Sequence, residues 1–89
     1  MEETTAGFQI GQIVVALAGR EAGERFVVVG LDEKRLWLAD GVKRRVGSPK
    51  KKNPRHVQRQ SHAVPVQLED GQLTDEAVRS ALRSCKEGD

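Results

Sequence analysis

The segment GQIVVALAGREAGERFVVVG, from Gly11 to Gly30, contains two β-branched runs separated by a loop with two glycines. Valine and isoleucine favour extended backbone, because their branched side chains fit a pleated surface. The two runs predict strands over residues 10–17 and 24–31, with alternate side chains on opposite faces. Glycine tolerates positive φ, so we expect the loop to turn the chain back on itself.

Turn residues divide the next part of the chain into further short strands. The polar residues 32–35 have the length of a hairpin loop, and Asp40-Gly41 is a strong turn pair. Gly47-Ser48-Pro49 should end a strand, because proline has no N–H to donate to a sheet. We expect a third strand over residues 35–40 and a fourth strand over residues 42–46. A lysine-rich loop should follow over residues 50–53, and a short closing strand over residues 55–58.

The C-terminal part has a different pattern. Residues 59–71 are interpreted as a linker, and residues 72–87 predict a helix that begins with Thr74 as N-cap. Acidic side chains follow at its positive end, which suits the helix dipole. Its apolar stripe must dock on the sheet or on a partner. The stripe consists of Val78, Ala81, Leu82 and Cys85.

Length and composition indicate one small domain. The chain has 89 residues, of which 37% are hydrophobic, so it has enough apolar surface for a modest core. Short sheets avoid exposed edges by curling, which predicts a mainly β fold with a small barrel of four or five strands over residues 8–58, followed by the C-terminal helix. Residues 1–7 are expected to be a flexible tail. The single cysteine favours a reducing compartment, and no signal peptide or membrane span is visible, so we expect a cytoplasmic protein.

The positive charge of the chain is concentrated in one block. Eight of the 15 Lys and Arg residues lie between Val42 and His62, and no Asp or Glu occurs from Gly41 to Leu68. The remaining seven cations face 13 acidic residues, so the net charge of +2 is a block of +8 on a background of −6. A cationic block of this kind is typical of a surface that binds a polyanion. The competing interpretation is a solvated run that serves solubility or localisation.

The glycine loop and the basic block together resemble a known family. GQIVVALAGREAGERFVVVG resembles the KOW motif, in which two hydrophobic strands flank a glycine-centred loop within an SH3-like barrel. Gly19 and Gly23 match the first two glycines of the motif, and Val27–Val29 match its second strand. Many KOW sequences have a further glycine where this chain has Phe26, and in that respect it looks more like the KOW-type ribosomal proteins of archaeal and eukaryotic large subunits.

The run ADGVKRRVGSPKKKNPRHVQ is similar to small bacterial KOW-domain proteins that are described as RNA-binding. The resemblance covers about residues 8–58. It implies an RNA-binding protein associated with the ribosome or with translation, whose partners are RNA, above all ribosomal RNA, and ribosomal proteins. It implies no membrane, small-molecule substrate or cofactor.

Phosphate contacts are assigned to the cations of the block and to one arginine in the glycine loop. Each cation that neutralises a phosphate releases counterions, which makes binding favourable and dependent on salt. Trp37 either stacks on a base or is a half-buried barrel residue. The predicted RNA-binding residues are Lys43, Arg44, Arg45, Lys50, Lys51, Lys52, Arg55, His56, Arg59 and Arg20.

Neither a metal site nor an enzyme is expected. His56, His62 and Cys85 supply at most three ligands, at spacings that match no zinc pattern. No nucleophile motif surrounds Cys85. A second hypothesis stays open: the chain is a protein-interaction module of the transcription or translation machinery, which uses the barrel and the C-terminal helix.

Overall fold

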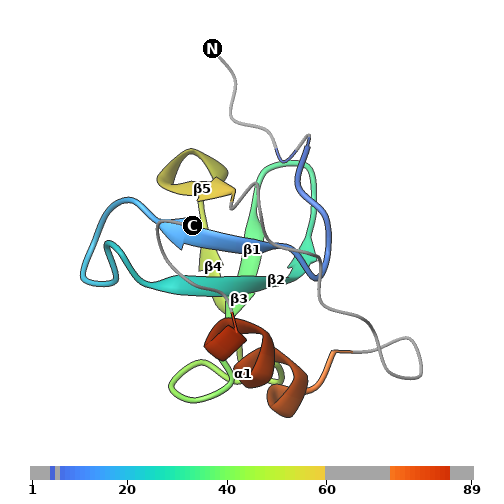
Figure 1. Cartoon of the computed structure of the whole chain (residues 1–89). Coiled ribbons are helices and arrows are strands. Elements are labelled where there is room, and N and C mark those ends of the chain that lie inside the picture. The colour runs from blue at the N-terminus through green and yellow to red at the C-terminus, as the bar shows by residue number, and fades with distance from the viewer. Residues whose placement is uncertain (1–4, 6, 60–72, 85–89) are drawn as a thin grey trace.

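A computed structural model of the chain describes Thr5, residues 7–59 and residues 73–84 (Figure 1). The described part is mainly β, with one short 3₁₀ turn and one α-helix. These elements are β1 (Ile13–Ala16), β2 (Arg25–Leu31), β3 (Leu36–Ala39), β4 (Lys50–Lys52), η1 (Pro54–His56), β5 (Val57–Arg59) and α1 (Asp75–Ser84).

The five strands form one antiparallel sheet in the order β4-β3-β2-β1-β5. The sheet is consistent with the predicted small SH3-like β domain, and its edge strands are β4 and β5. No strand pairing among the described residues joins these two edges, so by backbone hydrogen bonds the sheet is open. The mainly β class with a C-terminal helix is confirmed.

The two strands predicted from the Gly11–Gly30 segment pair with each other as expected. Val14 lies opposite Phe26, and Val15 lies opposite Arg25. The loop between the strands has Gly19 and Gly23 at positive φ, at 83° and 91°. Its ends are joined because the Gly23 N–H donates to the Ala16 carbonyl at 2.8 Å. The glycines therefore act as turn residues of a β hairpin.

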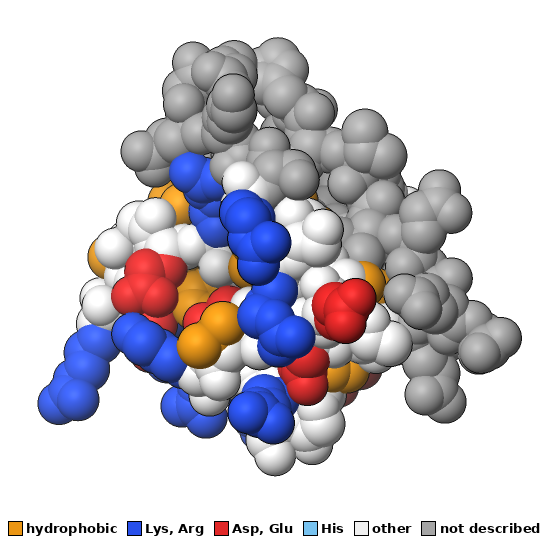
Figure 2. Space-filling model, turned by 60° about the horizontal axis from the view of Figure 1, so that its bottom comes forward, with side chains coloured by type: hydrophobic (Ala, Val, Ile, Leu, Met, Phe, Trp, Pro, Cys, Tyr) orange, Lys and Arg blue, Asp and Glu red, His pale blue; other side chains and the backbone are white. Residues whose placement is uncertain are grey.

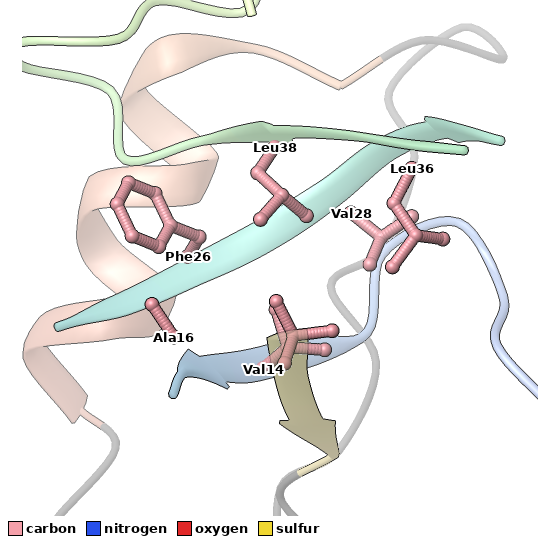
Figure 3. Packing of buried hydrophobic residues seen from close by; sticks show 7 residues of the cluster. Val14, Ala16, Phe26, Val28, Leu36 and Leu38 are labelled. Carbon is pink, nitrogen blue, oxygen red and sulfur yellow. The ribbon is translucent and has the colours of Figure 1, made fainter. Parts of the chain in front are cut away.

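Both faces of the sheet carry a hydrophobic cluster. On the concave face, alternate residues of β1, β2 and β3 meet, and Figure 3 shows the Phe26 ring at one end of this group, beyond Ala16 and Leu38. On the opposite face, Ile13 and Val27 pack against Leu73 and Val78 from the C-terminal segment. Strands covered on both faces read as continuous valine runs rather than as an alternating pattern. The first cluster consists of Val14, Ala16, Phe26, Val28, Leu36, Leu38 and Val57.

Helix α1 begins where the sequence predicts and docks on the sheet. The Thr74 side-chain oxygen accepts a hydrogen bond from the Ala77 N–H at 3.1 Å, which is the geometry of an N-cap. Val78 is fully buried, and Ala81 and Leu82 pack around it. The apolar stripe of the helix thus covers the second face of the sheet. Cys85, His62 and the predicted linker beyond Arg59 lie outside the described residues.

The predicted fourth strand over residues 42–46 is wrong. These residues form an irregular turn, and the fourth strand is Lys50–Lys52, which the sequence predicts as a loop. The reason lies in Asp40, whose Oδ1 accepts hydrogen bonds from the backbone N–H groups of Val42 and Arg44 at 2.8 and 2.9 Å. An aspartate that binds backbone amides two and four residues ahead holds the chain in a turn, and this local preference overrides β propensity.

The described N-terminal residues, in the stretch predicted as a flexible tail, contact the rest of the fold. Thr5 is buried, and its hydroxyl donates to the Asp32 carbonyl, while its N–H donates to the Glu33 carbonyl at 3.3 Å. Phe8, the first residue after that stretch, packs against the cluster on the concave face. The segment before β1 is therefore attached to the β2–β3 hairpin.

Candidate nucleic-acid interface

The segment that links β3 to β4, residues 40–49, carries three of the predicted RNA-binding residues on a fixed backbone. In addition to the two amides bound by the Asp40 side chain, the N–H groups of Asp40 and Gly41 donate to the Arg44 carbonyl at 2.9 and 3.1 Å. The Ser48 N–H donates to the Arg45 carbonyl at 2.9 Å. We call this segment the basic turn. Its side chains project from a backbone that several hydrogen bonds hold in place.

Helix α1 anchors the basic turn to the rest of the domain (Figure 1). The Asp75 carboxylate accepts a hydrogen bond from the Val46 N–H at 2.7 Å, and the Arg79 guanidinium donates to the Gly41 carbonyl at 2.7 Å. Val46 also packs against the cluster that α1 covers. The helix thus fixes both halves of the turn, which the sequence does not indicate.

Four exposed cations of the block lie in the basic turn and in β4. Lys43, Arg44 and Arg45 in the basic turn and Lys51 in β4 are all exposed. Among the described residues, no ion pair joins any of them to a carboxylate. Figure 2, which brings the α1 end of the molecule forward, shows Lys and Arg side chains across this face with some Asp and Glu among them. Cationic and acidic side chains are therefore mixed on this face.

Lys50 and Lys52, in contrast, form contacts within the fold. Both are half-buried and lie on the same face as Leu36 and Leu38, their partners in β3. Their ammonium groups reach the β1–β2 loop, where Lys50 Nζ lies 2.6 Å and Lys52 Nζ lies 3.9 Å from the Glu21 carboxylate. Lys52 also donates to the Ala18 carbonyl at 3.2 Å. These side chains connect β4 to the β1–β2 hairpin loop, across the concave face of the sheet.

The electrostatic effect of this bridge appears at Glu21. The hydrogen bond from Lys50 holds the pKa of the Glu21 carboxyl below its ordinary value of 4.5, against a smaller opposing effect of burial. One carboxylate oxygen, Oε1, is buried with no hydrogen bond in the described structure, and Lys52 Nζ lies 3.9 Å from it. The bridge therefore depends on the ionised form of Glu21.

The remaining predicted cations lie away from the basic turn along the chain. Arg55 and His56 are exposed in the η1 turn. Asn53 is the N-cap of this turn, and its side-chain oxygen accepts a hydrogen bond from the Arg55 N–H at 3.3 Å. The Arg59 guanidinium donates to the Gly7 carbonyl at 2.9 Å and lies 5.5 Å from the centre of the Phe8 ring. Arg59 thus holds the N-terminal segment against β5, which is a structural use of its charge.

A cavity of about 410 Å³ lies between the β1–β2 loop and the basic turn. We call it the loop cavity. Arg20, predicted as an outlying member of the cationic surface, lines it together with Lys43 and Arg44. The structure therefore brings together cations that are more than 20 residues apart in the sequence. Phe26 also lines it, with three acidic residues: Glu21, Glu24 and Asp40.

Trp37 is half-buried in β3, and its partner across the strand pair is Lys51. Residues opposite each other in an antiparallel pair point to the same face, so an aromatic ring and an unpaired cation are neighbours here. This geometry is compatible with both interpretations of Trp37, because the residue is half-buried and lies opposite Lys51.

No protein-family model matches this chain. No helix in residues 73–84, the helical part that the structure describes, is long and apolar enough to cross a membrane.

Sequence reasoning misses the residues that organise this surface. In the sequence, Glu21 and Glu24 are charges that weaken the case for Arg20, and Asp75 is a residue that suits the start of a helix. The contacts of Glu21 and Asp75 with the basic block span about 30 residues of chain. No local pattern signals such contacts, whereas the turn at Asp40-Gly41 is visible in the sequence.

Proposed function

We propose that this chain is a non-enzymatic RNA-binding protein of the ribosome or the translation apparatus, acting in the cytoplasm. The observation that carries the proposal is the set of exposed cations on an anchored backbone. Lys43, Arg44, Arg45 and Lys51 face solvent and form no ion pair among the described residues, and Arg20 adds a fifth charge across the loop cavity. The resemblance to KOW-type RNA-binding proteins, in the same residues, supports ribosomal RNA as the partner.

The mechanism is neutralisation of phosphates by side chains that a rigid scaffold presents. The basic turn is held by Asp40 from within and by Asp75 and Arg79 from the helix, so binding costs little ordering of the backbone. If four or five cations reach phosphates, log K should fall against log[salt] with a slope of about −3 to −4.5. Trp37 beside Lys51 offers a surface on which an unpaired base can stack.

The alternative function, a protein-interaction module, loses one of its two supports. It depended partly on the apolar stripe of the helix as a docking face, and Val78 in that stripe is fully buried against the sheet. Removing the helix would expose Ile13 and Val27, so a truncation would test folding rather than partner binding. Charge variants on the surface separate the two functions more cleanly.

The test is a salt titration of binding to structured ribosomal RNA fragments, followed by fluorescence anisotropy. The double variant R45Q/K51Q removes two exposed charges of the proposed interface. The matched control K34Q/R83Q removes two exposed charges elsewhere, so both variants have the same net charge. We expect R45Q/K51Q to reduce the salt slope by about 1.4–1.8 and the control to leave it close to that of the wild type.

Two outcomes would overturn the proposal. The first is binding that does not depend on salt, or no binding to RNA at all. The second is an equal loss in both variants, since that would show a response to net charge without any localised interface. Retained ribosome association in R45Q/K51Q together with absent RNA binding would favour the protein-interaction module.

A further inference from the structure

The loop cavity contains acceptors as well as cations, which phosphate binding alone does not require. Arg20, Lys43 and Arg44 supply the positive charge around it. Glu24 is exposed and has no ion pair with a described residue, although it lines the same cavity as these three cations. A surface built only to attract phosphates would be weakened by such a carboxylate. Its presence is useful if the ligand also has hydrogen-bond donors.

The oxygen atoms of the three acidic residues are not equally available. Glu21 is bound to Lys50, and one of its oxygens is buried. Asp40 uses Oδ1 for the N–H groups of Val42 and Arg44. Among the described contacts, the Glu24 carboxylate forms no ion pair and accepts no hydrogen bond from a backbone N–H. It is therefore the principal free acceptor of the loop cavity.

We propose that the loop cavity receives an unpaired guanine of the bound RNA. This inference rests on the proposed RNA-binding function and adds a base preference to it. An ionised carboxylate only accepts hydrogen bonds, and its two oxygens match two parallel donors. Guanine presents two adjacent donors, N1–H and the 2-amino group, on its Watson–Crick edge. Adenine and cytosine each present one amino group beside an acceptor nitrogen that repels a carboxylate, and uracil presents one N–H between two carbonyls.

The other residues that line the loop cavity suit a nucleotide whose base enters the cavity ahead of its phosphate. The Arg20 and Arg44 guanidinium planes can cover the face of an unstacked base, a contact that recurs in the recognition of single-stranded RNA. Lys43 supplies a charge for the phosphate attached to that nucleotide. Phe26 is 3% exposed and closes the cavity on its apolar side. The volume of about 410 Å³ falls within the range of small-ligand pockets.

The experiment uses the full chain and an RNA hairpin with a single bulged nucleotide, either guanosine, inosine or adenosine, at fixed salt. We expect the wild type to bind the guanosine hairpin roughly 5- to 150-fold more tightly than the adenosine hairpin. Inosine, which lacks the 2-amino group, should lie between them. Glu24→Gln replaces one acceptor with a donor, so the preference for guanosine should disappear and shift towards adenosine, whose edge pairs with a glutamine amide.

Glu33→Gln is the control, because Glu33 is an exposed acid on the β2–β3 hairpin, outside the loop cavity. This variant should keep the wild-type preference. Salt-dependent binding with no difference among the three hairpins would overturn the guanine site and leave the RNA-binding function standing. An undiminished preference in Glu24→Gln would equally refute it. Absence of binding to every hairpin would overturn both proposals.

Discussion

Gly41 is a position at which the basic turn packs closely on helix α1, so it is an informative site for a single substitution. It is buried and has a φ of +80°. A Cβ built at this position would lie 2.6 Å from the Asp75 carbonyl oxygen and 2.6 Å from Arg79 Cγ. The Asp75 contact is with helix backbone, which moves only if the helix shifts. Gly41→Ala should therefore displace α1 from the turn.

Two costs combine in Gly41→Ala. Forcing alanine into a left-handed conformation costs about 1–2 kcal/mol, partly offset because alanine restricts the unfolded chain. Overpacking against the helix adds about 1–3 kcal/mol. Gly23 separates these two costs, because its φ is +91° and no atom lies within 4 Å of the place that a Cβ would take there. Gly23→Ala carries only the backbone cost.

The assay is urea unfolding of both variants, followed by fluorescence of the single tryptophan, Trp37. We expect Gly41→Ala to lose about 1–3 kcal/mol more of the free energy of unfolding than Gly23→Ala. It should also weaken the proposed binding to RNA, since the turn would lose its anchor. Equal losses in the two variants would refute the close packing of the turn on the helix.

Two further predictions concern the helix and the Glu21 bridge. Val78→Ala should lower the free energy of unfolding by about 2–3 kcal/mol in urea, whereas Ser80→Ala on the exposed side of α1 should change it little; similar effects of both would contradict the packing of α1 on the sheet. The pKa values of Glu21 and Asp32 are lowered in the fold, by the Lys50 hydrogen bond and by the Lys34 and Arg35 N–H groups. Their stabilisation is present above the ordinary values of 4.5 and 3.8 and is lost as the pH falls through the lowered values. Glu21→Gln should therefore flatten the loss of stability in acid, and an unchanged acid limb would contradict the bridge.

The glycine-loop hairpin and the helix were predictable because their causes are local. The valine runs favour strands, the glycines supply the turn, and Thr74 caps α1 one residue before its start. The fourth strand was misplaced because β propensity at Val42–Val46 competes with the side chain of Asp40, which binds two amides of that segment. Lys50–Lys52 has a weak propensity for strands. It extends because it pairs with β3 and because Lys50 and Lys52 bind the β1–β2 loop.

The charge block was predicted as one surface, and the structure divides it by the alternation of a strand. Lys50, Lys51 and Lys52 are consecutive in the sequence. Lys51 faces solvent, whereas Lys50 and Lys52 face the concave side of the sheet. A run of three identical residues contains no information about which of them points outwards. That depends on the register of β4 with β3, which pairs Lys51 with Trp37. The sequence alone therefore could not predict how many cations are free to bind a ligand.

The structural lysines and the exposed cations are nevertheless connected. By binding Glu21, Lys50 holds the β1–β2 loop toward the β4 edge, and that loop carries Arg20 and Glu24. The basic turn lies just before β4 and carries Lys43 and Arg44 on the other side of the loop cavity. Lys50 and Lys52 thus hold the β1–β2 loop in a position that places Arg20 beside the cations of the basic turn. A replacement of Lys50 would then reduce the proposed RNA binding through the geometry of the loop cavity, even though the Lys50 side chain is half-buried and bound to Glu21.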